Sequence, residues 1–136
     1  PIQMAADLPK NYLAKPDAFQ FIQDVPTDWQ QSIALDGEVG DFIVFARKER
    51  KRDKYSGNDW YLGAVTDEKA RTIEVKLDFL EKGKEFEAHI YQDGKNAEWK
   101  NKPYDLDIEK RVVSANDKLT LKLATSGGTA IRFKAL

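Results

Sequence analysis

The feature that most constrains the fold of this chain is a series of short segments, beginning near residue 31, in which apolar and polar side chains alternate. Successive side chains of a β-strand point to opposite faces, so this alternation is typical of strands. Turn residues separate the segments, most clearly Asp93-Gly94 and the Ser-Gly-Gly of residues 126–128. The predicted strands span residues 32–35, 42–48, 59–66, 71–77, 85–92, 104–114, 118–124 and 129–135. This pattern predicts an all-β fold, an antiparallel β-sandwich of about eight strands.

Residues 1–29 differ from the rest of the chain and predict a short helical lead. Pro16 suits a first helical position, and Phe19 and Ile22 follow at the spacing of one helical face, before Pro26 ends the helix. Upstream, the apolar side chains are compatible with the last turns of an earlier helix; they are Ile2, Met4, Ala5 and Leu8. We therefore expect a helical lead or linker over residues 1–29 and a β-sandwich domain over residues 30–136. Residues 1–25 should pack on the sandwich, with Phe19 and Phe21 as anchors.

Charge and composition exclude several classes of function. The formal net charge is −1 and the sequence pI is about 5.9, so there is no electrostatic argument for a nucleic-acid or membrane partner. The sequence has no cysteine, which removes disulfides, thiolate metal sites and cysteine nucleophiles. It has one histidine, which makes a zinc site or a Ser–His–Asp triad hard to build. The opening residues carry neither an initiator Met nor a signal segment, and we interpret the chain as a fragment or a processed product.

Acidic residues are plentiful, but their positions do not predict catalysis. Glycoside hydrolysis needs two carboxyl groups placed across a cleft. Here the acidic side chains lie in or beside predicted turns, where carboxylates bond to the nearby backbone; they are Glu38, Asp41, Asp59, Asp67 and Glu68. We therefore predict no catalytic residue in this chain.

Other polar groups favour structural interpretations as well. The oxygen atoms of Asp93, Asn96 and Glu98 suit calcium, but their spacing is not that of an EF-hand loop, so we predict a surface turn and no metal site. His89 is expected on the outward face of its strand. The basic stretch 47–54 is interrupted by acidic residues and predicts a solvated hairpin loop.

The aromatic residues leave two interpretations open. Trp99, Trp60 and Tyr61 are candidates for contact with carbohydrate, because sugar rings stack on exposed aromatic faces. Trp60 and Tyr61, however, lie in a segment that is apolar on both faces, and a strand of this kind is expected to be covered on both. We therefore favour packing for this pair, and regard Trp99, in an irregular polar stretch, as the better candidate for exposure.

The order of these segments resembles the C-terminal region of glycoside hydrolase family 97. The most specific part is "DWYLGAVTDEKART" joined to "LDFL" and "YQDGKNA", and the resemblance runs over essentially the whole chain. It implies a parent protein with an N-terminal β-sandwich, a catalytic (β/α)₈ barrel and a C-terminal all-β domain linked to assembly. The helical lead would then be the end of the barrel, which is the expected partner, with a homo-oligomer as a further possibility.

The same resemblance carries expectations about chemistry. Family members hydrolyse α-glucosidic or α-galactosidic bonds, and they use a calcium ion in the catalytic part. Their catalytic carboxylates and calcium ligands come from the first two parts of the parent, so none is transferred to a residue here and no cofactor is expected in this chain. Export to the periplasm is also implied for the parent.

Two functions remain as hypotheses. The first is a non-catalytic accessory or oligomerisation domain of an α-glycosidase. The second is a carbohydrate-binding module that uses exposed aromatic side chains. Independent enzymatic activity of this chain is not expected.

Overall fold

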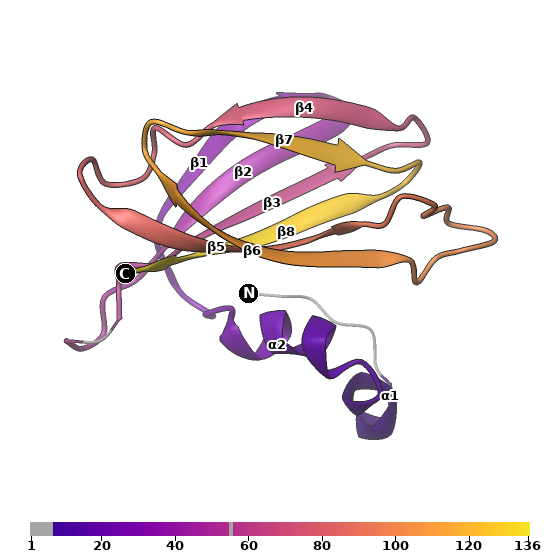
Figure 1. Ribbon diagram of the computed structural model, residues 1–136, viewed down its shortest axis with the longest axis horizontal. Coiled ribbons are helices and arrows are strands. Elements are labelled where there is room, and N and C mark those ends of the chain that lie inside the picture. Colours follow the sequence, from indigo (N-terminus) through magenta and orange to yellow (C-terminus); the bar gives the residue numbers. More distant parts are fainter. Residues whose placement is uncertain (1–6, 55) are drawn as a thin grey trace.

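A computed structural model describes residues 7–54 and 56–136 of the chain. Two short helices precede eight strands (Figure 1). In chain order the elements are α1 (Pro9–Leu13), α2 (Pro16–Asp24), β1 (Trp29–Glu38), β2 (Phe42–Glu49), β3 (Trp60–Thr66), β4 (Arg71–Lys76), β5 (Glu85–Asp93), β6 (Leu106–Ser114), β7 (Lys118–Leu123) and β8 (Gly128–Ala135).

The strands form two antiparallel sheets, as the sequence predicted. Six strands make the larger sheet in the order β1-β2-β3-β8-β5-β6, and β4 pairs with β7 in the smaller one. Figure 1 shows β4 and β7 on one side of the large sheet and the two helices on the other. The predicted strand at 32–35 is longer than expected, because β1 spans Trp29–Glu38, and β6 begins at Leu106 rather than at residue 104.

The hydrophobic core lies between the two sheets. On β3, β5, β7 and β8, alternate residues are buried there, including Leu62, Phe86, Leu121 and Phe133. Burying one such side chain stabilises the fold by roughly 1.5–3 kcal/mol. This alternation is the pattern that the sequence displays, so the inner faces of the sheets follow directly from it.

Two helices make up most of the described part of the lead. Helix α2 begins at Pro16, whose fixed φ suits a first helical position, and it ends before Pro26, as predicted. A separate short helix, α1, precedes it. The predictions for Ile2, Met4 and Ala5 lie outside the described residues. The described helices are too short and too polar to span a membrane.

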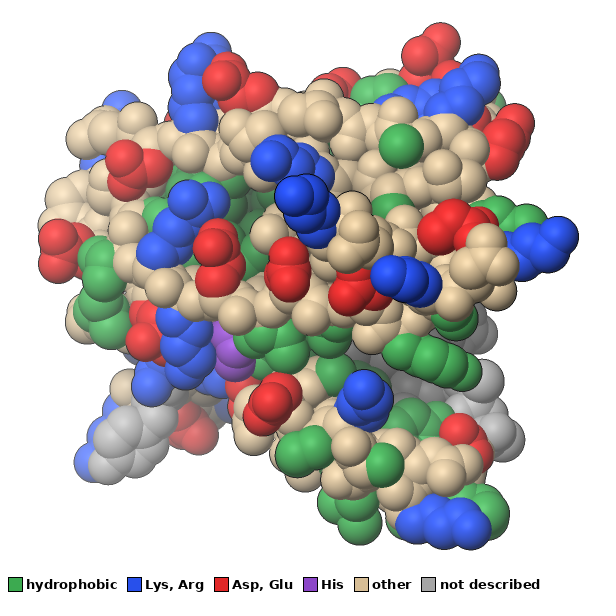
Figure 2. Space-filling view, turned by 45° about the vertical axis from the view of Figure 1, so that its right-hand side comes forward, with side chains coloured by type: hydrophobic (Ala, Val, Ile, Leu, Met, Phe, Trp, Pro, Cys, Tyr) green, Lys and Arg blue, Asp and Glu red, His purple; other side chains and the backbone are tan. Residues whose placement is uncertain are grey.

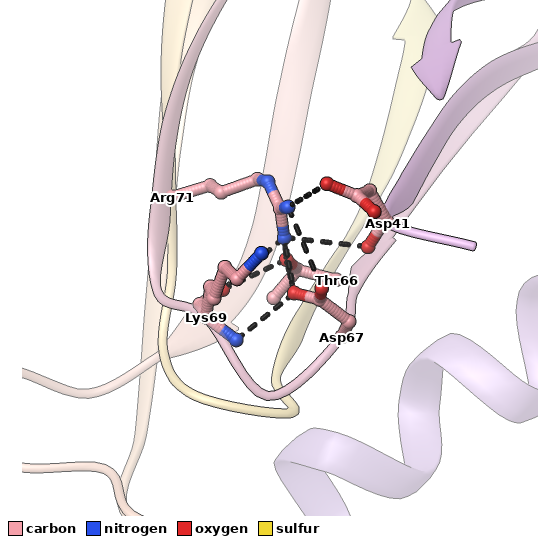
Figure 3. A network of polar contacts seen from close by, with 5 residues as sticks. All are labelled: Asp41, Thr66, Asp67, Lys69 and Arg71. Atoms are coloured by element: carbon pink, nitrogen blue, oxygen red, sulfur yellow. Dashed lines mark hydrogen bonds and ion pairs between the residues drawn. The ribbon is translucent and has the colours of Figure 1, made fainter. Parts of the chain in front are cut away.

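A polar network ties the two sheets together at one end of the sandwich (Figure 3). Arg71 of β4 pairs with Asp41, before β2, at 2.7 Å, and with Asp67 in the β3–β4 turn. It also donates to the Thr66 hydroxyl, while the Lys69 N–H donates to Asp67 at 2.9 Å. The hydrogen bond from Arg71 holds the pKa of the Asp67 carboxyl below its ordinary value. The sequence placed Asp41 and Asp67 in turns correctly, but their pairing with Arg71 was not foreseen.

Candidate interaction surface

The outer face of the large sheet, which turns away from β4 and β7, is the surface of interest. Strand register places its outward side chains in rows that cross the sheet. One row contains His89, Arg132, Tyr61 and Arg47, from β5, β8, β3 and β2. Helix α2 lies over this row. We call the contact between α2 and the large sheet the joint.

The apolar part of the joint centres on Phe21 of α2. Its ring centroid lies 5.2 Å from that of Tyr91 and 6.1 Å from that of Tyr61, both in edge-on geometry. The ring centroid of Trp29 lies 5.4 Å from that of Tyr61, also in edge-on geometry. Aromatic pairs of this geometry add stabilisation beyond the area they bury. Phe21 is therefore one of the two anchors that the sequence predicted. The other, Phe19, packs against Tyr12 of α1 at 5.6 Å.

The polar part of the joint centres on Arg132 of β8. One guanidinium nitrogen lies 2.7 Å from the Asp24 carboxylate at the end of α2. Two others donate to Asp59 at 2.9 and 3.0 Å, and Asp59 also accepts the Ala135 N–H. The Tyr61 hydroxyl donates to the Asp24 backbone carbonyl at 3.0 Å, and burial raises the pKa of Tyr61. The joint therefore combines aromatic packing with partly buried, charge-assisted hydrogen bonds.

Sequence reasoning did not identify the role of Arg132 or Asp59. Asp59 was predicted to serve only the local turn, and no role was predicted for Arg132. The available signal was weak: Arg132 is a charged residue at an outward position between two buried ones, Ile131 and Phe133. His89 does face outward as predicted, but it is only half-exposed, and it hydrogen-bonds to the Tyr91 hydroxyl at 3.0 Å.

Beyond Tyr91, on which Phe21 of α2 packs, two further rows of the outer face are apolar. We call them the apolar strip, which consists of Ile43, Phe45, Gly63, Val65 and Ala130. Val65 is 56% exposed and Ile43 is 42% exposed, which corrects the expectation that this strand is covered on both faces. A Cβ atom added at Gly63 would meet nothing within 4 Å, so the centre of the strip is open.

A hollow of about 430 Å³ lies on the other side of α2, where the helices meet β6. Its lining is largely apolar and includes Ala14, Pro16, Ala18, Tyr104 and Ile108. Figure 2 shows hydrophobic side chains gathered around the helices and beside the single histidine. Contiguous exposed apolar surface of this kind marks contact sites for other protein surfaces.

The three candidate carbohydrate contacts differ in how far their side chains are exposed. Trp60 is 3% exposed and packs in the core, with its ring 5.2 Å from that of Phe79. Tyr61 is 5% exposed and lies under α2. Trp99 is 62% exposed, in the loop between β5 and β6. The structure thus agrees with packing for the Trp60–Tyr61 pair and displays the ring of Trp99.

Two of the residues considered for calcium, Asp93 and Glu98, accept hydrogen bonds from backbone N–H groups. The Asp93 carboxylate accepts the N–H groups of Ala124 and Gly128 at 2.8 and 2.9 Å. Glu98 instead caps its own loop by accepting the Asn101 N–H at 2.8 Å. Within residues 7–54 and 56–136, no group of three His, Cys, Asp or Glu side chains is arranged to hold a metal. These carboxylates accept hydrogen bonds from the backbone of nearby turns.

Comparison with known proteins places these features in context. Residues 28–134 match the family model described as glycosyl-hydrolase 97 C-terminal, oligomerisation. The chain is 38% identical over 134 residues to the retaining alpha-galactosidase of Bacteroides thetaiotaomicron, covering 98% of this chain and 19% of that protein.

Solved structures give the same picture. A glycoside hydrolase family 97 enzyme from Pseudoalteromonas sp. strain K8, solved in complex with acarbose, is 90% identical with a TM-score of 0.95. The match covers 98% of this chain and 20% of that one. A beta-arabinopyranosidase is 28% identical with a TM-score of 0.70 over 97% of this chain and 19% of its own. The chain therefore spans about a fifth of the length of these relatives.

Proposed function

Because this chain belongs to the C-terminal oligomerisation family of glycoside hydrolase family 97, we propose that it assembles the subunits of a larger glycosidase and supports its catalytic part. The observation that carries the proposal is the match over residues 28–134, which takes in all eight strands except the last residue of β8. The outer face supports it, because that face carries open apolar surface beside an already formed helix–sheet joint.

The experiment is isotope-mixed cross-linking of the full-length enzyme. Subunits grown in ¹⁴N and ¹⁵N media are mixed, cross-linked through lysines and analysed by mass spectrometry. We expect mixed-isotope cross-links that join residues 28–134 of one subunit to residues 28–134 of another. Cross-links confined to single subunits, or mixed ones that never involve this domain, would contradict the proposal.

We propose further that the parent enzyme acts on oligosaccharides of α-linked glucose. The support is the 90% identity to a Pseudoalteromonas enzyme that was solved with acarbose and, as a variant, with panose. The alpha-galactosidase relative is less similar, at 38%. The full-length enzyme should therefore hydrolyse panose faster than a nitrophenyl α-galactoside, and the reverse order would refute this choice. The calcium ion and the periplasmic location expected from the family resemblance stay proposals for that parent.

A second candidate function is carbohydrate binding, which the exposure of Trp99 favours. A hollow of about 220 Å³ beside it is lined in part by Lys102, Pro103 and Ser126. Titration of tryptophan fluorescence with malto- and galacto-oligosaccharides tests this. A saturable change that Trp99→Ala abolishes would support a binding module, and a flat trace would leave assembly as the function.

A further inference from the structure

We infer that strand β6 pairs edge to edge with β6 of a second copy of this chain, antiparallel and about a two-fold axis at Glu109. The large sheet then continues from one subunit into the next. The inference rests on the proposed assembly function and deepens it by naming the strand that joins the subunits. Three observations on β6 carry it.

The first observation is that β6 has an open and regular edge. It is the last strand of the large sheet, and within residues 7–54 and 56–136 no strand lies on its other side. The opposite edge strand, β1, has register shifts between Trp29 and Gln31 and between Ala34 and Asp36, and such bulges protect an edge from pairing. Strand β6 pairs with β5 over its nine residues without a shift. Its free edge is therefore regular enough to accept another strand.

The second observation is the direction of the backbone groups of β6. The Gly94 N–H donates to the Asp105 carbonyl at 2.9 Å, in the same register as the β5–β6 ladder. Hydrogen-bonded positions alternate along an antiparallel pair, so the backbone of the odd-numbered residues of β6, such as Glu109, bonds to β5. The N–H and C=O groups of the even-numbered residues turn to the free edge; up to residue 112 they are Leu106, Ile108, Lys110 and Val112. An added strand can form a second ladder with these groups.

The third observation is that the side chains of β6 complement their own reverse order. With two copies antiparallel about Glu109, Asp107 faces Arg111 of the partner subunit, and the two-fold symmetry repeats this pair. On the other face Leu106 meets Val112 of the partner subunit, and in one copy these side chains are 42% and 59% exposed. Glu109 meets its own copy at the axis, where the Arg111 of the same strand flanks it at 3.7 Å. One register therefore joins opposite charges and apolar side chains.

Neighbouring registers fit this edge less well. Charged side chains commonly protect a sheet edge, so two copies can pair only where the signs of the charges match. Moving the centre back by one residue would set Asp107 against Glu109 of the partner subunit. Moving it forward by one would bring the Ser114 N–H into the ladder, but this group already donates to Asp117 at 2.7 Å. The register about Glu109 avoids both conflicts, which favours a second copy as the occupant of the edge.

The first test uses the absence of cysteine from this sequence. Glu109→Cys places one thiol at the inferred axis, where the Cα atoms of facing residues are about 4.5 Å apart, within the range of a disulfide. Glu74→Cys on β4 is the matched control, because Glu74 is also an exposed glutamate on a strand. Each variant of the full-length enzyme is equilibrated in a glutathione redox buffer, its free thiols are blocked, and the digested peptides are analysed by mass spectrometry.

A peptide that contains residue 109 and is joined to its own copy can come only from two subunits. Relative to the unjoined peptide, we expect it to be about tenfold or more as abundant as the corresponding product of Glu74→Cys, because pairing raises the effective concentration of the facing thiol. Equal yields from the two variants would overturn the inference.

The second test reverses the charges that face each other. Asp107→Arg or Arg111→Asp alone sets like charges together on both sides of the axis, so self-association of the full-length enzyme should weaken by about tenfold or more. Mixed one to one, the two variants place an arginine against an aspartate on both sides, and association should recover. Sedimentation measures all three samples. Single variants that associate like the original enzyme, or a mixture no stronger than its components, would overturn the inference.

The design separates a contact between subunits from an effect inside one subunit. Mixing cannot repair damage to the fold of a single subunit, and melting curves of both variants check that fold directly. The isotope-mixed cross-links described above are recorded on the same samples. If cross-links between the two domains persist while residue 109 does not join its own copy and the charge reversals have no effect, the assembly function stands and only this inference fails.

Discussion

Arg132 on strand β8 and Asp24 at the end of helix α2 form an ion pair of 2.7 Å that joins the lead to the sheet. The same guanidinium holds Asp59, which lies just before β3. Three distant parts of the chain thus meet at one partly buried cation. Removing one partner of such a contact is costly, because it leaves a partly buried charge without compensation.

Removing the aromatic ring of Phe21 should destabilise the contact between α2 and the sheet. We expect Phe21→Ala to lower the free energy of unfolding by about 2 kcal/mol, since the ring is half-buried between Tyr61 and Tyr91. Phe19→Ala is the matched control, because Phe19 packs on Tyr12 of the short helix α1 and should cost less. Urea unfolding followed by circular dichroism measures both. An equal cost for the two substitutions would show that Phe21 has no special role.

Trp60 and Trp99 should respond differently to truncation. Trp60→Ala is expected to cost about 3–5 kcal/mol, because the ring is enclosed in the core. Trp99→Ala should stay within about 0.5 kcal/mol of the original chain, because its ring is mostly in solvent. Thermal and urea melts provide the comparison. A small effect at Trp60 would contradict the assignment of this residue to packing.

The Arg71 network predicts a specific loss of stability in acid. The pKa of Asp67 is lower in the folded chain than its ordinary value of 3.8, so the charged form favours folding. This contribution is complete above that ordinary value and is lost as the pH falls through the lower, folded pKa. Asp67→Asn should be less stable near neutral pH, and its stability should fall less steeply in acid. Urea midpoints measured across the acid range test this; parallel curves for the two proteins would rule it out.

The strands were predictable from sequence because their inner faces alternate. Leu119, Leu121 and Leu123 face the core at period two, and the adjoining polar residues face solvent. The order of strands was not predictable in the same way. Strand β8 inserts between β3 and β5, and period two defines which side chains share a face without defining which strands are neighbours.

The candidate surface was predicted only in part. Phe21 was identified as an anchor because it is a large apolar residue in a short lead. The prediction that β3 is covered on both faces was wrong at Val65. Helix α2 covers the strand at Tyr61 and not at the far end, where Val65 lies. The partners of Arg132 lie more than seventy and more than a hundred residues away in sequence, so only the folded chain brings them together.

The central claim, that α2 and the large sheet form one cooperative joint, is tested most directly by a double-mutant cycle between Asp24 and Arg132. The variants are Asp24→Asn, Arg132→Met and the pair, with Lys134→Met as the control for losing an outward positive charge on the same strand. Asp24→Asn keeps the backbone carbonyl that accepts the Tyr61 hydroxyl. From urea unfolding we predict a coupling energy of about 1 kcal/mol or more, with Lys134→Met close to neutral. Effects that simply add, within about 0.3 kcal/mol, would contradict the claim.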